Sequence, residues 1–213
     1  MPAPRKFTRD QLRATALQMV DEHGLAALTM RSLASALGTG AMTIYNYVDG
    51  REGLEQLVTE AVMAEASWEA APSKDWGDEA AAITTGIWRA VRSHPNAIPL
   101  ILTRRSLDPA TLDAAEALLN ALTRSGRTGT DLLIAFRLTT SFITGFAQSE
   151  LAGPLSIERG ESPTTTIDRV QALPADRYPN LIGIARAAAG DPEAEFRAGL
   201  RILLTGLARA DEH

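Results

Sequence analysis

The stretch that decides the fold is residues 28–58, LTMRSLASALGTGAMTIYNYVDGREGLEQLV. It predicts a helix capped by Thr29, a tight turn at residues 38–40 (GTG), a short helix over about residues 41–47, and the start of a further helix. Two short helices joined by a glycine-containing turn are typical of a helix-turn-helix, whose second helix enters the major groove of DNA.

The flanking sequence supplies the rest of a small helical head. Thr8 and Gln11 have the spacing of a capping box, Phe7 is placed to pack onto Leu12, and Gly24 is a natural helix stop. The sequence therefore predicts a helix that ends before Gly24 and whose inner face holds Leu12, Ala16, Met19 and Val20. Downstream, Asp49 and Glu52 resemble a capping box that opens a helix over residues 51–68.

Beyond a break at residues 71–74 the pattern remains helical. Asp-Pro and Gly signals delimit predicted helices at about 75–93, 98–103, 109–124, 130–151, 180–189 and 192–210. Residues 152–179 are rich in Pro, Gly, Ser and Thr and are expected to form a loop. The expected fold class is all-α.

Composition excludes several classes of site. The 213 residues include no cysteine, so disulfides, thiolate zinc sites and cysteine nucleophiles are ruled out. No apolar run approaches the roughly 18 residues of a membrane span, and residues 1–10 lack a signal-peptide core. These features lead us to expect a cytoplasmic protein with no membrane partner.

Charge is distributed unevenly along the chain. The net charge is −5, but residues 1–48 hold five basic side chains against three acidic ones, a net charge of +2, which leaves −7 for the remainder. A mildly basic head on an acidic body fits a local DNA footprint better than general binding to polyanions.

The short helix over residues 41–47 would present its side chains to base edges. Asn46 is a bidentate partner for adenine, and the methyl groups of Ala41, Met42 and Thr43 can contact the thymine methyl group. No arginine lies on this helix, so strong guanine recognition is not expected from it. The alternative is that Asn46 is simply solvated.

Other side chains of the head are expected to contact the DNA backbone. The hydroxyls of Thr43, Tyr45 and Tyr47 can donate to phosphates, Thr29 and the helix it caps can hold a phosphate, and Arg51 is placed for the backbone. Arg31 can reach a base or a phosphate. The expected DNA-binding residues are Thr29, Arg31, Gly40, Ala41, Met42, Thr43, Tyr45, Asn46, Tyr47 and Arg51. Packing roles for the two tyrosines and a plain surface role for Arg31 remain alternatives.

Residues 7–58 resemble the DNA-binding domain of the TetR family of bacterial transcriptional repressors. The resemblance is carried by L-T-M-R-x-L-A-x-x-L-G at residues 28–38 and T-I-Y-x-Y-V at residues 43–48. A fainter resemblance to the tetracycline-repressor subgroup continues through the Trp76 helix, Ser93-His94, residues 103–105 and the two long C-terminal helices. It implies a three-helix DNA-binding domain over residues 1–50, a connector helix over 51–68, and a helical effector-binding and dimerisation domain over 73–213.

The resemblance also implies a homodimer. A single helix-turn-helix binds weakly, and a twofold dimer that binds two half-sites is the usual solution. The two most apolar C-terminal helices are the expected interface, in a four-helix bundle as in the TetR family; the alternative is that both faces pack inside one protomer. The expected interface residues are Leu133, Phe136, Ile143, Phe146, Phe196, Leu200, Leu203 and Leu207.

The resemblance further implies a small-molecule effector that releases a palindromic DNA operator. It would bind between helices of the second domain. The expected contacts are Ile87, Trp88, Ile101, Arg104, Thr140 and Phe142; the alternative for each is a plain packing role in the core. His94 matches the subgroup's helix-end histidine, but Ile101 stands at its metal-ligand position and Ala66-Ser67 replace the histidine near the end of the connector helix. This departure argues against magnesium-bound tetracycline and favours an apolar, metal-free effector; no cofactor or metal site is expected.

Two other function classes are alternatives. The sequence contains no G-x-S-x-G, H-E-x-x-H, glycine-rich phosphate loop or metal-spaced histidine cluster, so we expect no catalytic residues and no enzyme activity. A helical partner-binding protein without DNA is the second alternative, and a steep dependence of DNA affinity on salt separates the two. Transcriptional activation instead of repression also stays open.

Overall fold

The computed structural model describes residues 7–69, 75–104, 106–152, 156, 161–185, 187 and 190–210. Over these residues the chain forms α helices and two short 3-10 turns, η1 (Leu25–Ala27) and η2 (Pro95–Ala97), with no strand. The helices are α1 (Arg9–His23), α2 (Met30–Ala36), α3 (Ala41–Tyr45), α4 (Gly50–Ala64), α5 (Trp76–Ser93), α6 (Ile98–Thr103), α7 (Pro109–Thr123), α8 (Gly129–Ala152), α9 (Pro163–Gln171), α10 (Pro179–Ala185) and α11 (Pro192–Ala210). The all-α expectation is confirmed.

Local signals begin the first helices where the sequence predicts. Thr8 and Gln11 form a reciprocal capping box on α1, with hydrogen bonds of 3.2 and 2.9 Å. Gly24 ends α1 with a φ of 76°, a backbone conformation that glycine adopts at little cost. Thr29 caps α2 and shares its capping box with Ser32.

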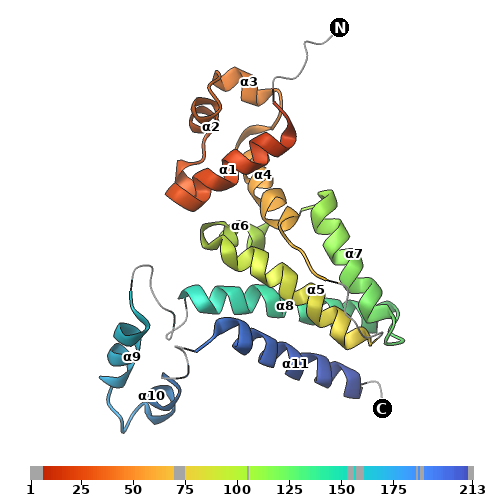
Figure 1. The fold of residues 1–213 in the computed structure, drawn as a ribbon, viewed down its shortest axis with the longest axis vertical. Helices are drawn as coiled ribbons and strands as arrows, with labels where there is room; N and C mark the ends of the chain where they lie inside the picture. The colour runs from red at the N-terminus through yellow and green to blue at the C-terminus, as the bar shows by residue number, and fades with distance from the viewer. Residues whose placement is uncertain are drawn as a thin grey trace.

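Helices α1 to α4 form a head at one end of the molecule (Figure 1). Its core consists of fully buried aliphatic side chains from all four helices, including Leu12, Leu33, Ile44 and Leu57. Because α4 packs along α1 and then continues toward α5 and α7, it belongs to the head and to the body of the protein at once.

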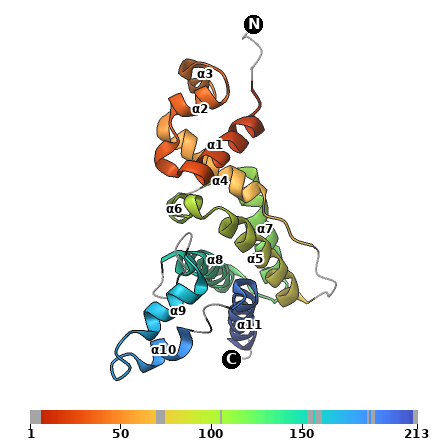
Figure 2. The same ribbon diagram turned by 60° about the vertical axis from the view of Figure 1, so that its left-hand side comes forward.

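An aromatic cluster joins the three long helices of the body. The ring of Trp88 on α5 stacks on Phe196 of α11 with centroids 4.4 Å apart, and Phe146 of α8 meets both rings edge-on. Trp88 and Phe196 are fully buried. Each aromatic pair of this kind stabilises the fold by about 0.5–1.5 kcal/mol beyond the free energy gained from burying its apolar surface. The cluster therefore fixes α8 and α11 against α5 (Figure 2).

Three expectations about the elements are wrong. The segment 152–179 is not all loop, because Ser162 and Pro163 begin α9 just as Asp108 and Pro109 begin α7. Helix α4 ends at Ala64 instead of about residue 68. The side chain of Asp49 makes no capping hydrogen bond to α4, so the capping box expected with Glu52 is absent. The break expected at residues 71–74 lies outside the described residues.

Helices α9 and α10 pack on each other and project from the side of the body (Figures 1 and 2). No described helix combines the length and the apolar character that a membrane span requires.

The segment that follows α4 crosses α5 at Gly86. A β-carbon at Gly86 would overlap the carbonyl oxygen of Ser67 and lie 3.3 Å from the Trp68 β-carbon. Glycine in the middle of α5 is therefore required by a close approach of two backbones, and this approach fixes the path of the chain between head and body.

We predict that Gly86→Ala lowers the free energy of unfolding by about 1–3 kcal/mol, the usual cost of overpacking. Urea denaturation followed by circular dichroism measures the change. Gly183→Ala in α10 is the control, because a β-carbon there meets nothing within 4 Å and replacing a helical glycine is neutral or favourable. Equal stability of the two variants would contradict this account of the crossing.

Candidate functional site

The helix-turn-helix is held from inside by a few buried anchors. Ile44 of α3 is fully buried, and Val48 just beyond it is 7% exposed. The turn between α2 and α3 depends on Gly38, whose φ of 62° lies in the left-handed region. Its closing hydrogen bond runs from the Thr39 N–H to the Ala34 carbonyl, at 2.9 Å. These contacts orient α3 with one face toward solvent.

That outward face carries most of the expected DNA contacts. Met42 is 77% exposed and Tyr45 52% exposed, although both are large and partly apolar. Asn46, Gly40 and Arg31 are also exposed, whereas Ala41 and Thr43 are half-buried. Within the described residues no hydrogen bond or ion pair engages the side chain of Arg31. We call Arg31, Gly40, Ala41, Met42, Thr43, Tyr45 and Asn46 the reading face.

Three expected DNA contacts are instead engaged within the protein. The hydroxyl of Tyr47 accepts a hydrogen bond of 2.9 Å from the Phe7 N–H, and its half-buried ring meets the Phe7 ring edge-on. Arg51 donates to the carbonyls of Leu28 and Leu25, at 2.5 and 3.0 Å. Thr29 uses its hydroxyl as the cap of α2. Their side chains therefore shape the head rather than extend from it.

Much of the positive charge of the head is paired internally. Arg9 makes a bidentate ion pair with Glu60, a residue of α4 that is only 2% exposed, and Arg13 pairs with Asp10. Arg5 and Lys6 lie outside the described residues. Within the described part of the head, Arg31 is thus the guanidinium left open to a phosphate or a base.

A network centred on Glu55 joins the head to α6. Glu55 on α4 accepts from Arg51 at 2.5 Å and from Arg104, which follows α6, at 2.7 Å. Burial by itself raises the pKa of Glu55, but the hydrogen bonds from the two arginines outweigh it and lower the pKa below its ordinary value. Because Arg51 also holds the Leu28 carbonyl, an unbroken chain of hydrogen bonds runs from α6 to the residue before the cap of α2.

A second junction lies at the end of α5. His94 contacts Asp21 of α1 through Nδ1 and Glu65 at the end of α4 through Nε2, each at 2.8 Å. Asn96 donates to the carbonyls of Val20 and Asp21. Burial by itself lowers the pKa of His94, but the hydrogen bonds to Glu65 and Asp21 outweigh it and raise the pKa above its ordinary value.

The side chains expected to bind an effector serve other purposes. Trp88 and Phe142 belong to the aromatic cluster, Ile87 is 7% exposed, and the Thr140 hydroxyl donates to the Phe136 carbonyl. Ile101 packs half-buried on the core. Arg104 lines a cavity of about 690 Å³ beside Glu52 and Glu55, and its guanidinium forms ion pairs with both of their carboxylates.

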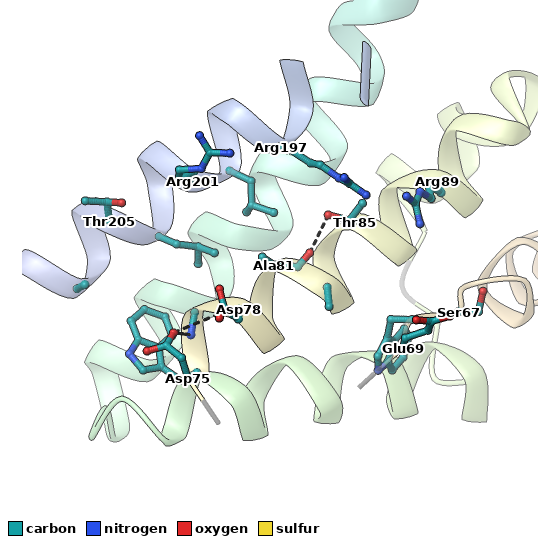
Figure 3. A pocket seen from close by; sticks show the side chains of 17 residues that line it. Ser67, Glu69, Asp75, Asp78, Ala81, Thr85, Arg89, Arg197, Arg201 and Thr205 are labelled. Atoms are coloured by element: carbon teal, nitrogen blue, oxygen red, sulfur yellow. Dashed lines mark hydrogen bonds between the residues drawn. The ribbon is translucent and has the colours of Figure 1, made fainter. Parts of the chain in front are cut away.

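A groove of about 1100 Å³ lies between α5, α11 and residues 67–69 (Figure 3). None of the six expected effector contacts lines it. Its walls carry Trp68, Trp76, Ala81, Arg197 and Arg201, among others. Residue patterns could not reveal it, because its walls come from three segments that only the fold brings together.

The structure packs most of the expected dimer contacts inside one protomer. Ile143, Phe196, Leu200 and Leu207 are buried inside the protomer, and Phe136, Phe146 and Leu203 are half-buried against its core. Leu133 alone of the eight is exposed. The large apolar side chains that α8 and α11 do expose are Leu133, Ile134, Leu138, Leu151 and Ile202. The main apolar face of each helix thus packs inward.

Within the described residues, no group of three or more acidic or histidine side chains is arranged to hold a metal ion.

The chain was compared with known protein families and curated proteins. Residues 12–66 match the family model described as bacterial regulatory proteins of the tetR family, and residues 69–210 match the tetracyclin repressor-like C-terminal domain. An HTH-type transcriptional regulator of Saccharopolyspora erythraea is 28% identical, over 95% of this chain and 85% of its own length. The HTH-type transcriptional repressor DrrR1 of Streptomyces coeruleorubidus is 29% identical, over 94% of this chain and 77% of its own length.

Solved structures with the same fold include the TetR family protein ActR of Streptomyces coelicolor. Its complex with (S)-DNPA superposes with a TM-score of 0.77 at 26% identity, covering 96% of this chain and 98% of that one. Its complex with actinorhodin has the same TM-score and identity and covers 96% of both chains.

The His94 junction predicts a dependence of stability on pH. The pKa of His94 is higher in the folded protein than the value of about 6.5 in the unfolded chain. The contacts of protonated His94 therefore stabilise the fold fully at a pH below the unfolded pKa, and this stabilisation is lost as the pH rises through the folded pKa. Chemical denaturation should therefore show that His94→Gln destabilises more at pH 6 than at pH 8.5, by a difference on the order of 1 kcal/mol. The control is His23→Gln, at an exposed histidine of α1. A cost for His94→Gln that is equal at both pH values would contradict the assignment.

Proposed function

Because the chain belongs to the TetR family of bacterial transcriptional regulators, we propose that it is a homodimeric repressor that binds a palindromic operator and releases it when an effector binds. The observation that supports this most strongly is the reading face. Met42 and Tyr45 remain exposed on a helix whose other side is locked by Ile44, and large exposed side chains on a rigid support are typical of a binding surface.

The reading face fits the chemistry of operator recognition. Met42, Ala41 and Thr43 offer methyl groups to thymine, and Asn46 offers a bidentate amide to adenine. Tyr45 and Arg31 flank them with a hydroxyl and a guanidinium that suit phosphates. Tyr47 and Arg51 are left out of the proposed contacts, because both are held by backbone groups of the head. Thr29 contributes through the helix N-terminus that it caps.

The proposed dimer uses the outer faces of α8 and α11. Ala198, Ile202 and Gly206 are exposed and lie four residues apart, so they share one face of α11. On α8, Ile134, Leu138, Ser141 and Gly145 form a comparable exposed face. Small side chains beside a few large apolar ones allow close approach of helices from two protomers, and twofold symmetry then spaces two reading faces for successive major grooves, roughly 34 Å apart.

The proposed release mechanism moves α4. An effector can shift the protein only by binding the non-DNA-binding arrangement more tightly. The Glu55 network ties α4 and Arg51 to α6, and the His94 junction ties α1 and the end of α4 to α5. A rearrangement of the body therefore reaches the reading head through both junctions. The proposal that a small molecule binds the protein is supported by the similar protein ActR, whose structure was solved in complex with actinorhodin.

The proposed domain division places the DNA-binding domain at residues 1–50 with α4 as connector, and the effector and dimer functions in residues 73–213. A protein that regulates bacterial genes acts where the chromosome is, so the cytoplasm is its proposed location. DrrR1, a relative named as a repressor, favours repression over activation.

We predict that Tyr45→Ala and Arg31→Ala each weaken operator binding by about tenfold or more, since one base or phosphate contact contributes about 1–3 kcal/mol. The operator would first be selected from a random duplex library with the unaltered protein, and affinity would be measured by fluorescence anisotropy across a salt series. Tyr178→Ala, on the segment before α10, is the matched control. Failure to select any sequence, or unaltered affinity of both variants, would overturn the proposal.

We predict that Gly206→Trp dissociates the dimer and leaves the protomer folded. Gly206 is exposed and a β-carbon there meets nothing within 4 Å, so we expect the indole to project outward and to obstruct a partner. Sedimentation should show a dimer for the unaltered protein, and a dissociation constant at least about tenfold higher for the variant, a difference of about 1.4 kcal/mol. Glu116→Trp at an exposed position of α7 is the control. A dimer that tolerates Gly206→Trp uses a different interface.

A further inference from the structure

The groove between α5 and α11 shares a wall with the chain that leaves α4. Ser67, Trp68 and Glu69 follow the last residue of α4 by a few positions, and they line the groove opposite Arg201 and Thr205 of α11 (Figure 3). The groove thus touches the segment that leads to the reading head and the helix proposed for the dimer. A molecule that fills it would push on both.

The side of the groove nearest α11 is cationic. Arg89 of α5 and Arg197 of α11 both pair with Glu193, at 3.0 and 2.7 Å. The side chain of Arg201, one turn further along α11, makes no hydrogen bond or ion pair within the described part of the chain. Three guanidiniums therefore face one carboxylate, an excess of two positive charges, and we call these three arginines the cationic rim.

The acidic side chains of the groove stand apart from this rim. Asp75 and Asp78 lie together at the end formed by the start of α5, and Glu69 lies beside Ser67 (Figure 3). Asp75 is used as the cap of α5, where it accepts from the Gly77 and Asp78 N–H groups. Its charge is offset by the helix N-terminus, so the rim remains the part of the groove that favours an anion.

The rest of the lining suits flat rings. Trp68 and Trp76 contribute indoles, and Ala81, Ala82 and Ala208 leave a shallow floor without bulky side chains. Trp76 is held by the guanidinium of Arg127, 5.4 Å from its ring centre. Indoles stack on aromatic ligands, and the volume of the groove admits a molecule of several rings.

We propose that this groove binds an aromatic anion, a molecule of two or more rings with a carboxylate or sulfonate group set on Arg201 and Arg197. The ligand differs from the apolar one that the sequence suggests, because it binds at charged side chains of α11 instead of at the buried residues around Trp88. Release of DNA by this ligand rests on the proposed function. Binding of the ligand in the groove is independent of that function.

The test uses two probes with the same rings. 8-Anilinonaphthalene-1-sulfonate carries the negative charge, and N-phenyl-1-naphthylamine lacks it. Titration of the full-length protein, followed by probe fluorescence and by energy transfer from tryptophan, should give one sulfonate site per protomer and at least tenfold weaker binding of the uncharged probe. Arg201→Gln should weaken the sulfonate about tenfold and leave the uncharged probe unchanged. Arg209→Gln, on the same helix but outside the groove, is the matched control.

Three results would overturn the proposal: equal affinity for the two probes, equal effects of the two arginine substitutions, or sulfonate binding that survives Trp68→Ala together with Arg201→Gln.

A separate anisotropy experiment with the selected operator then adds the sulfonate. Probe binding without any operator binding by the protein would refute the proposed function and leave the groove assignment standing. Operator binding with no Arg201-dependent probe site would refute the groove assignment alone.

Discussion

The carboxylate of Glu55 holds together the parts of this molecule that its function requires. It sits on α4 at low exposure and accepts hydrogen bonds from arginines at two sides, Arg51 within the head and Arg104 beyond α6. The Glu55 side chain is 13% exposed and those of Arg51 and Arg104 are 47% and 26% exposed, so water partly screens the pairs and each contributes less than a fully buried pair would. Because one carboxylate pairs with both arginines, it ties the position of α4 to that of the residue after α6.

The rest of the architecture follows from this constraint. A reading face must stay exposed, so it cannot be stabilised by its own burial and depends on the anchors behind it, Ile44 and the carbonyls of Leu25 and Leu28. Those carbonyls are held by Arg51, and Arg51 is held by Glu55. The same helix α4 continues into the segment that crosses α5 at Gly86 and forms one wall of the groove. The proposed DNA-binding head and the proposed ligand groove thus meet on α4 and the segment after it.

Local signals in the sequence were sufficient for much of the fold. The caps at Thr8, Thr29 and Asp108 and the glycines at 24 and 38 depend on hydrogen bonds and backbone angles within a few residues, and the structure has them where they were expected. Ser162 and Pro163 carry the same kind of signal, and it was hidden by the loop-like composition around them. The exposure of Met42 and Tyr45 also followed from local pattern, because the period of a short helix separates them from the buried Ile44.

Long-range choices could not be made in the same way. Periodicity shows that α8 and α11 are apolar, but it does not show whether Phe196 and Leu200 face a partner or their own core; the stacking of Phe196 on Trp88 decides that. Arg51 and Tyr47 look like DNA contacts in sequence, and only the fold reveals the carbonyls and the N–H group that engage them. The groove needs Ser67, Asp78 and Arg201 to come together from distant parts of the chain.

Amide hydrogen exchange tests most directly whether α6 controls the reading head through Glu55. Arg104→Gln removes the pair with Glu55, and the control Arg124→Gln removes a more exposed ion pair within the body, that with Glu79. If the network acts as described, Arg104→Gln will speed exchange over residues 28–45 several-fold, because local opening of the head becomes easier, and Arg124→Gln will not. Unchanged exchange over these residues in Arg104→Gln would contradict the coupling on which this account depends.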